Sequence, residues 1–270
     1  MPLAVCATPI GNLEDVTLRV LAELAAAEVV LCEDTRHTRV LLERHGIAVR
    51  LLSYHEHNEA ARVAELLPRL EAGGRVALVS DAGLPGISDP GARLVRAARA
   101  AGVQVTVLPG ASAVETALVT SGLAESRYAF LGFLPRRAAE LEQLWQELER
   151  WPWPVVAFES PQRLPRSLRS LAAFEAERQV AVCRELTKRF EEVVRGAARE
   201  LAQRFDAPPK GEITLVLGPA AESAENGEAE DRALAAVAEL VEVGVPRKRA
   251  AEVVSKLAGI SRNRLYKASL

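Results

Sequence analysis

The chain has 270 residues, of which 49% are hydrophobic, so we expect a packed core divided into one large or two medium domains. The formal net charge of −2 excludes a global electrostatic attraction to nucleic acid, so any such attraction has to be local. Cys6, Cys32 and Cys183 lie in apolar runs without metal-ligand spacing, which predicts buried thiols in a reducing compartment and no metal site. We find no secretion-signal pattern and no apolar run of the roughly 20 residues that span a bilayer, so a cytoplasmic protein is expected.

Strand-like apolar runs alternate with helical patterns in the first part of the chain. Strands are predicted at 3–7, 29–32, 51–54, 76–79 and 103–108, with helices at 18–24, 40–46, 61–70 and from 91 onward. Asn12 or Asp15 is expected to cap the first helix. The alternation predicts an N-terminal α/β domain, residues 1–113, with a largely parallel sheet.

A second, smaller α/β domain is predicted at 114–220. Its strands are expected at 128–134, 155–158, 180–183 and 213–217, with a helix at 141–148, and short connections favour some antiparallel pairing. Residues 221–231 carry five acidic and no basic side chains, and we interpret them as a linker. Residues 232–270 are predicted to form a helical tail that resembles a helix-turn-helix.

The stretch 74–91 is the most informative part of the chain. It begins as a strand, continues as a loop rich in glycine and proline that carries Asp81 and Asp89, and becomes a helix after Gly91. Glycine lets a backbone approach a ligand closely, and carboxylates at the end of a strand hold hydroxyls or cations. The pattern therefore favours a binding loop over a plain tight connection.

Other polar residues have weaker or double interpretations. Residues 9–12 match neither a phosphate-binding Walker loop nor a GxGxxG fingerprint, which argues against kinases, ATPases and classical dehydrogenases.

Residues 109–112 either lay backbone amides against a ligand or only begin a helix. Three histidines at strand ends match no metal-ligand spacing and are expected to be solvated. They are His37, His55 and His57.

Charged residues in the second domain also allow two interpretations. Arg136 and Arg137 follow a strand and either hold a phosphate or begin a solvated helix. Glu159 and Glu185 end strands and either face a cleft or pair with a neighbouring arginine.

The tail after residue 246 is strongly basic. It has seven arginines or lysines and one acid, Glu252. An ordinary solvated face is possible, but this imbalance favours contact with nucleic acid. The basic residues are Arg247, Lys248, Arg249, Lys256, Arg262, Arg264 and Lys267.

Several motifs resemble those of the tetrapyrrole-methylase superfamily, and more closely those of its ribosomal RNA branch. They are ATPIGNLED at 7–15, CEDTR at 32–36, SDAGLPGISDPG at 80–91, PGASA at 109–113, FLGFLP at 130–135, ESP at 159–161, RELTK at 184–188 and KGE at 210–212. The resemblance covers essentially the whole chain. Only Gly11 stands where tetrapyrrole methylases usually carry three glycines, and this form is typical of the RNA branch.

The resemblance implies S-adenosylmethionine bound in a cleft between two α/β domains of a homodimer. It also implies methyl transfer to the ribose 2′-hydroxyl of a cytidine in the decoding region of 16S RNA, with no membrane or DNA partner. The expected cofactor-binding residues are Pro9, Asp81, Ala82, Gly83, Ser88, Pro90, Gly110, Ser112, Phe133, Leu186 and Thr214. Arg136, Arg137 and the basic tail are expected to contact RNA.

Methyl transfer to a hydroxyl is an in-line displacement that depends on positioning, with help from a general base. Candidates for the base are Asp34, Glu159, Glu185 and Glu212, and we favour Glu159 because it ends a strand facing the expected cleft. Two alternatives stay open. One is a methyltransferase acting on a corrin or porphyrin precursor, and the other is a non-catalytic RNA-binding assembly factor with this fold.

Overall fold

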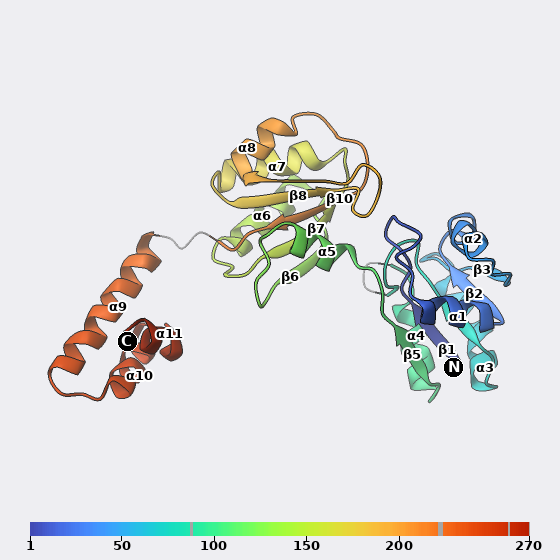
Figure 1. Cartoon of the computed structure of the whole chain (residues 1–270), viewed down its shortest axis with the longest axis horizontal. Coiled ribbons are helices and arrows are strands. Elements are labelled where there is room, and N and C mark those ends of the chain that lie inside the picture. Colours follow the sequence, from blue (N-terminus) through green and yellow to red (C-terminus); the bar gives the residue numbers. More distant parts are fainter. Residues whose placement is uncertain (87–88, 221–223, 259, 270) are drawn as a thin grey trace. The chain divides into compact units, whose positions relative to one another are not determined.

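The computed structural model describes residues 1–86, 89–220, 224–258 and 260–269, without the side chains of 224–231, 263, 264 and 267. The chain forms two compact units, one of residues 1–147 and 151–219 and one of residues 148–150 and 220–270 (Figure 1). Ser88 and linker positions 221–223 lie outside the described residues. Within the described ranges, no helix has the length and apolar character needed to cross a membrane.

The first domain is built on a sheet of five parallel strands, in the order β3-β2-β4-β1-β5. The strands are β1 (Leu3–Cys6), β2 (Val29–Cys32), β3 (Leu51–Ser53), β4 (Val76–Leu78) and β5 (Val105–Leu108). Every residue of β1, β2 and β4 is buried, which explains why these strands are continuous apolar runs. The predicted parallel α/β arrangement is confirmed.

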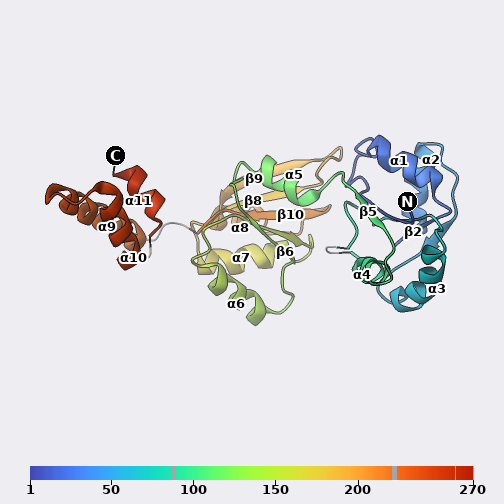
Figure 2. The same cartoon turned by 90° about the horizontal axis from the view of Figure 1, so that it is seen from below.

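Helices cover both faces of this sheet (Figure 2). One face packs against α1 (Leu18–Ala26) and α2 (Thr35–Arg44), and the other against α3 (Glu59–Glu71) and α4 (Ala92–Ala100). The predicted cap of α1 was wrong, because the side chain of Thr17 accepts the N–H of Val20. All five strands end at the same edge of the sheet, where loops from several strands meet.

The second domain is a mixed sheet in the order β6-β7-β10-β8-β9. The strands are β6 (Ala129–Phe133), β7 (Val155–Glu159), β8 (Gln179–Arg184), β9 (Glu192–Ala197) and β10 (Ile213–Leu217). Strand β10 pairs antiparallel with β7 and β8, whereas β6 and β7 are parallel. This is the antiparallel pairing that the short connections favoured.

Helix α5 (Ala113–Thr120) packs on one face of the second sheet, and α6 (Ala138–Leu148) and α7 (Leu164–Phe174) cover the opposite face (Figure 2). Helix α8 (Ala198–Arg204) contacts α7. Strand β9 and helices α7 and α8 were not predicted from the sequence.

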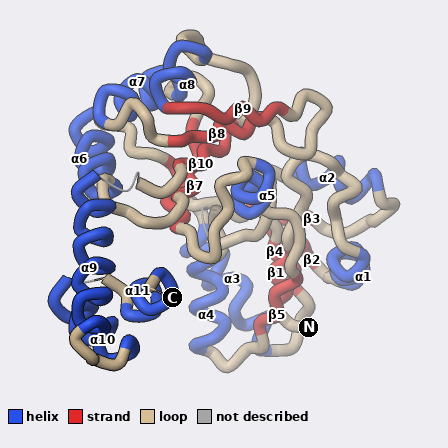
Figure 3. The backbone as a smooth tube through the Cα atoms, turned by 60° about the vertical axis from the view of Figure 1, so that its left-hand side comes forward, coloured by secondary structure: helices blue, strands red, loops and turns tan. Residues whose placement is uncertain are grey.

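The second unit contains α9 (Ala224–Glu242), α10 (Arg247–Ala258) and α11 (Arg262–Ala268), drawn together in Figure 3. These helices enclose their own core, formed by Ala233, Val237, Ala250, Ala251, Val254 and Leu265. Helix α9 begins at Ala224, so the backbone of residues 224–231, which we interpreted as a linker, is helical. Alanine and glutamate both favour helix, and the negative charge of the acidic residues alone does not prevent helix formation.

Candidate active site

Two loops at the edge of the first sheet are joined by backbone hydrogen bonds. The N–H of Thr8, after β1, donates to Gly83 O at 2.8 Å, and the N–H of Gly83, after β4, donates to Thr8 O at 3.1 Å. Gly83 has a φ of +79°, a conformation that side-chain-bearing residues rarely adopt. This pairing and the bond from Thr8 Oγ1 to Ser80 O at 3.0 Å hold the Asp81–Ala82 turn at both ends.

The loop after β1 also contacts the loop after β8, from the second domain. The N–H of Asn12 donates to Thr187 Oγ1 at 3.0 Å. A Cβ added at Gly11 would lie 2.5 Å from Lys188 Cγ, so the two loops meet where only glycine fits. Thr187 and Glu185 have φ values of +64° and +52°, and such strained backbone occurs most often at functional sites.

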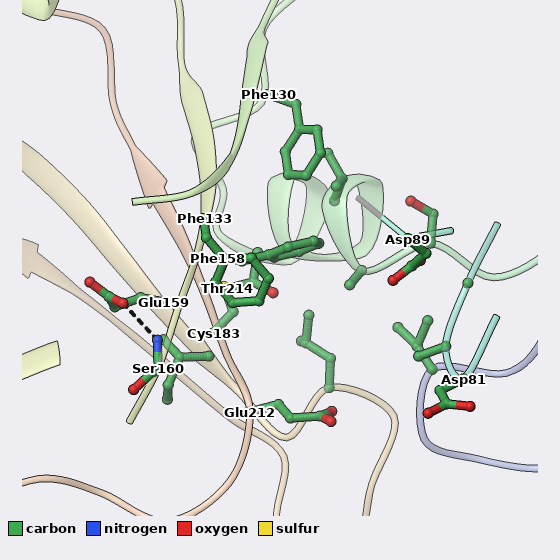
Figure 4. A pocket seen from close by; sticks show the side chains of 18 of the residues that line it. Asp81, Asp89, Phe130, Phe133, Phe158, Glu159, Ser160, Cys183, Glu212 and Thr214 are labelled. Atoms are coloured by element: carbon green, nitrogen blue, oxygen red, sulfur yellow. Dashed lines mark hydrogen bonds between the residues drawn. The ribbon is translucent and has the colours of Figure 1, made fainter. Parts of the chain in front are cut away.

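A cavity of about 610 Å³ lies among the loops of both domains (Figure 4). Three aromatic rings form one side of it. The ring centroids of Phe130 and Phe133 lie 5.0 Å and 5.5 Å from that of Phe158. The volume is typical of a site for a small molecule or cofactor.

Acidic side chains from both domains also line this cavity, and no lysine, arginine or histidine is among its described lining residues. Burial, with the nearby carboxylates Glu33 and Asp81, raises the pKa of Asp89 to about 6. Burial and then Asp81 raise the pKa of Glu33 in the same direction. Like charges that crowd together in this way are relieved by a cationic ligand. The lining acids are Glu33, Asp81, Asp89, Glu159 and Glu212.

Most residues predicted to bind the cofactor lie around this cavity. Those that line it are Asp81, Ala82, Gly83, Ser112, Phe133, Leu186 and Thr214. Pro9 lines a second, smaller cavity instead. Pro90 and Gly110 line neither cavity, and Gly110 lies against Ala7, where an added Cβ would be 3.0 Å from the alanine Cβ. The position predicted for Ser88 is outside the described residues.

The structure adds lining residues that the sequence analysis missed: Glu33, Asp89, Phe130, Phe158 and Ser160. Asp89 belongs to the motif at 80–91 and Phe158 precedes Glu159, so a neighbouring motif could have indicated that both residues lie at the site. Cys183 also lines the cavity, but burial raises the pKa of its thiol to about 12, which excludes it as a thiolate nucleophile at neutral pH.

The surroundings of Glu159 argue against its predicted role as a base. Its side chain is fully buried, and its Oε1 accepts the N–H of Ser160 at 2.7 Å and pairs with Arg163 (Figure 4). Oε2 accepts the hydroxyl of Ser167 at 2.5 Å. Both oxygens are therefore held by donors of the protein, an arrangement that anchors the start of α7.

Asp34 lies outside both cavities. It caps α2 through the N–H of Arg36 at 2.8 Å, and its Oδ2 pairs with the guanidinium of the same residue at 2.7 Å. The Arg36 hydrogen bonds hold the pKa of Asp34 well below its usual range. A carboxylate so stabilised in its ionised form is a weak proton acceptor, which argues against Asp34 as the base.

The residues predicted to contact RNA are mostly exposed. Arg136 and Arg137 follow β6, and Arg137 pairs with Glu140 at 3.0 Å. In the tail, Lys248, Arg249, Lys256 and Arg262 are exposed. The side chain of Arg247 donates to the backbone oxygen of Ser269. The side chains of Arg264 and Lys267 are not among those that the structure describes.

Comparison with known families gives a clear result. The profile of the family Tetrapyrrole (Corrin/Porphyrin) Methylases matches residues 2–202, which include the whole first sheet, four strands of the second sheet and most residues that line the larger cavity. The chain belongs to this family. It is a methyltransferase enzyme, and its cofactor is S-adenosylmethionine.

Within the family the chain is most informatively compared with curated relatives. A protein of Mesorhizobium japonicum named Ribosomal RNA small subunit methyltransferase I is 44% identical over 268 residues, covering 98% of this chain and 90% of the relative. A protein of the same name from Synechocystis is 40% identical, covering 99% of this chain and 97% of the relative.

Solved structures share the fold. The uroporphyrin-III-C-methyltransferase of Thermus thermophilus superposes with a TM-score of 0.58 at 23% identity, covering 81% of this chain and 94% of that chain. A diphthine synthase superposes with a TM-score of 0.58 at 16% identity, covering 80% and 89%.

The larger cavity fits S-adenosylmethionine by its chemistry. The cofactor carries a positively charged sulfonium and an ammonium group, and the cavity supplies carboxylates and aromatic faces, which both attract cations. Asp81 and Asp89 are the residues that would offset the positive charge.

Proposed function

We propose that this enzyme transfers a methyl group from S-adenosylmethionine to the 2′-hydroxyl of a cytidine ribose in the decoding region of 16S ribosomal RNA. It would act as a homodimer on the small ribosomal subunit in the cytoplasm. The observation that carries the proposal is the similarity, over nearly the whole chain, to proteins named Ribosomal RNA small subunit methyltransferase I. That similarity continues past residue 202, where the family profile ends, and so includes the basic tail.

The charge distribution supports an RNA substrate. The chain as a whole is slightly acidic, yet α10 exposes Lys248, Arg249 and Lys256 within three turns. Arg249 and Lys256 share one acidic partner, Glu252, at 3.0 Å and 3.1 Å, which leaves a net positive surface. Folded RNA is recognised largely through phosphates and 2′-hydroxyls, and exposed cations suit this contact.

The cavity residues position the reaction. When bound, S-adenosylmethionine supplies an already activated methyl group, so much of the catalysis comes from aligning the acceptor oxygen with it. The Thr8–Gly83 pairing and the Asn12–Thr187 bond fix the loops that line the site. Phe130, Phe133 and Phe158 would give the bound cofactor an apolar wall on one side.

The test is transfer of a labelled methyl group to small ribosomal subunits that lack the modification. Naked 16S RNA and a precorrin are supplied in parallel reactions, and the labelled product is digested to nucleosides. Label in 2′-O-methylcytidine from the subunit is the expected result. Label on the precorrin alone would replace the proposal by a tetrapyrrole substrate. Binding of cofactor without transfer to any acceptor would favour the non-catalytic alternative.

A further inference from the structure

A second cavity, of about 200 Å³, adjoins the larger one. The loop after β1 and helix α2 form much of its wall, including Leu13, Thr38 and Leu41. The two cavities share Ile10, Asp81, Ala82 and Glu212. A group bound in the smaller cavity would therefore lie next to a group bound in the larger one, at the boundary that these four residues form.

His37 lines the smaller cavity from the first turn of α2. Its Nδ1 lies 3.8 Å from Oδ1 of Asp81, and that oxygen also accepts the N–H of Asp34 at 3.2 Å. The carboxylate is thus held in place from one side while it faces the imidazole on the other. Nδ1 is the ring nitrogen beside Asp81, so Nε2 would be the nitrogen that acts on a molecule in the cavity.

The carboxylates first considered as the base are engaged elsewhere. Both oxygens of Glu159 are held by donors in the second domain, and Asp34 is paired with Arg36 outside both cavities. Glu185 and Glu212 are both paired with Lys188, at 3.0 Å and 2.7 Å. Histidine is also the side chain whose charge normally changes between pH 5 and 8, which suits reversible proton acceptance near neutrality. The His37–Asp81 pair is therefore a candidate for the proton-accepting group at this site.

We propose that the smaller cavity receives the ribose of the target nucleotide and that His37 accepts the proton of its 2′-hydroxyl. This inference rests on the proposed function. As the 2′-oxygen forms its bond to the methyl carbon, the hydroxyl proton passes to Nε2 of His37, and the electron pair of the breaking carbon–sulfur bond stays on sulfur. Asp81 orients the ring and stabilises the resulting imidazolium. The side chain of His37 is 57% exposed, so the proton then passes to solvent.

The charges around His37 are compatible with this role. Lys188 is paired with Glu212 at 2.7 Å, and Arg36 is paired with Asp34, so both nearby cations are offset by an acid. The charged groups that line the cavity together with His37 are Asp81, Lys188 and Glu212, and Asp34 and Arg36 lie at the start of its own helix.

The experiment compares wild type, His37→Gln and His57→Gln in single-turnover methyl transfer to unmodified small subunits, with saturating cofactor, between pH 5.5 and about 8.5, spanning the range in which histidine normally titrates. His57 is the matched control because it is an exposed strand-end histidine outside both cavities. We expect His37→Gln to lower the rate by about 100-fold or more and to remove the fall in rate at acidic pH. No cofactor contact is assigned to His37, so the cofactor affinity of His37→Gln, measured by calorimetry, should stay within about twofold of wild type. Added imidazole should partly restore His37→Ala.

Each other outcome overturns the inference in a recognisable way. If wild type methylates the subunit and His37→Gln keeps its rate and its pH profile, the proposed function stands and the role of His37 is refuted. If His37→Gln loses rate equally at every pH and imidazole gives no rescue, His37 is only structural. If wild type methylates the precorrin alone, both proposals fall, because a carbon acceptor has no hydroxyl proton to give.

Discussion

The backbone N–H of Asn12 donates to Thr187 Oγ1 across 3.0 Å, and this bond joins a loop of the first domain to a loop of the second. Gly11, the neighbour of Asn12, lies so close to the same loop that a side chain there would overlap Lys188 Cγ. Gly11 and Lys188 line the smaller cavity, but the same two loops also supply Ile10 and Leu186 to the larger one. We therefore expect the packing of this contact to control cofactor affinity.

Gly11→Ala should therefore weaken S-adenosylmethionine binding by about tenfold or more, because overpacking costs about 1–3 kcal/mol and tenfold corresponds to 1.4 kcal/mol. Calorimetric titration measures the change. The control is Gly102→Ala, whose φ of +74° makes it strained but whose Cβ would meet nothing within 4 Å. That variant should lose stability and keep its affinity. Equal affinities for Gly11→Ala and wild type would show that the contact does not shape the site.

Asp81→Asn should reduce cofactor affinity by roughly 10- to 100-fold, since hydrogen bonds to charged groups contribute about 1.5–3 kcal/mol. Asparagine keeps the acceptor for the N–H of Asp34 and removes only the charge. Asp15→Asn, an exposed acid outside both cavities, is the matched control. Unchanged affinity in Asp81→Asn would show that this carboxylate does not face the cofactor.

Cofactor affinity should rise with pH through the titration of Asp89. Burial and neighbouring acids raise the pKa of Asp89 to about 6, so near that pH the carboxyl is partly protonated in the free enzyme. A bound cation favours the ionised form, so binding releases protons and affinity increases as pH rises from about 5 to about 7. Calorimetry at pH 6 in two buffers of different ionisation enthalpy measures the release. Asp89→Asn should abolish most of it, and a wild-type heat independent of buffer would contradict this prediction.

Glu159→Gln should mainly destabilise the fold. Removing one partner of a buried ion pair costs about 3–5 kcal/mol, because the Arg163 guanidinium is left without its counter-charge. Urea unfolding of Glu159→Gln, Arg163→Gln and the double variant should show strong non-additivity. At a temperature where Glu159→Gln stays folded, its single-turnover rate should remain near that of wild type. A large loss of rate with a normal unfolding midpoint would restore Glu159 as the base.

Substitution of the exposed tail cations should weaken RNA binding and flatten its salt dependence. In Lys248→Gln/Lys256→Gln/Arg262→Gln, each lost phosphate contact should reduce the slope of log affinity against log salt by about 0.7–0.9. The control removes three exposed positive charges from α4, at Arg93, Arg96 and Arg99. If both triple variants show the same slope, the tail makes no specific contribution. Cofactor affinity should not change in either.

Much of the fold could be predicted because burial leaves a direct mark on sequence. Strands β1, β2 and β4 are buried on both faces and read as apolar runs. Helix α7 was missed although Leu164, Leu168 and Leu171 have helical spacing, because Pro165 suggests a break; proline is tolerated there in the first turn. Strand β9 carries two charged residues and is only partly buried, so its sequence is not a continuous apolar run.

The site was harder to predict because it depends on residues that only the fold brings together. The motif at 80–91 indicated Asp81 as a binding residue, but nothing local shows that α2 places His37 beside it. Glu159 was assigned by its position at a strand end. Its partners Arg163 and Ser167 lie only four and eight residues further along the chain, but the sequence does not show that their side chains contact Glu159.

The three-helix unit that follows residue 219 has a hydrophobic core made from its own helices. The methylase profile ends at residue 202, before this unit begins. If these helices bind RNA as proposed, methyl transfer and substrate delivery are encoded in separate stretches of the gene. Selection could then alter or exchange the delivery unit while leaving methyl transfer intact, which is a simple route by which one methyl-transfer scaffold is redirected to a macromolecule.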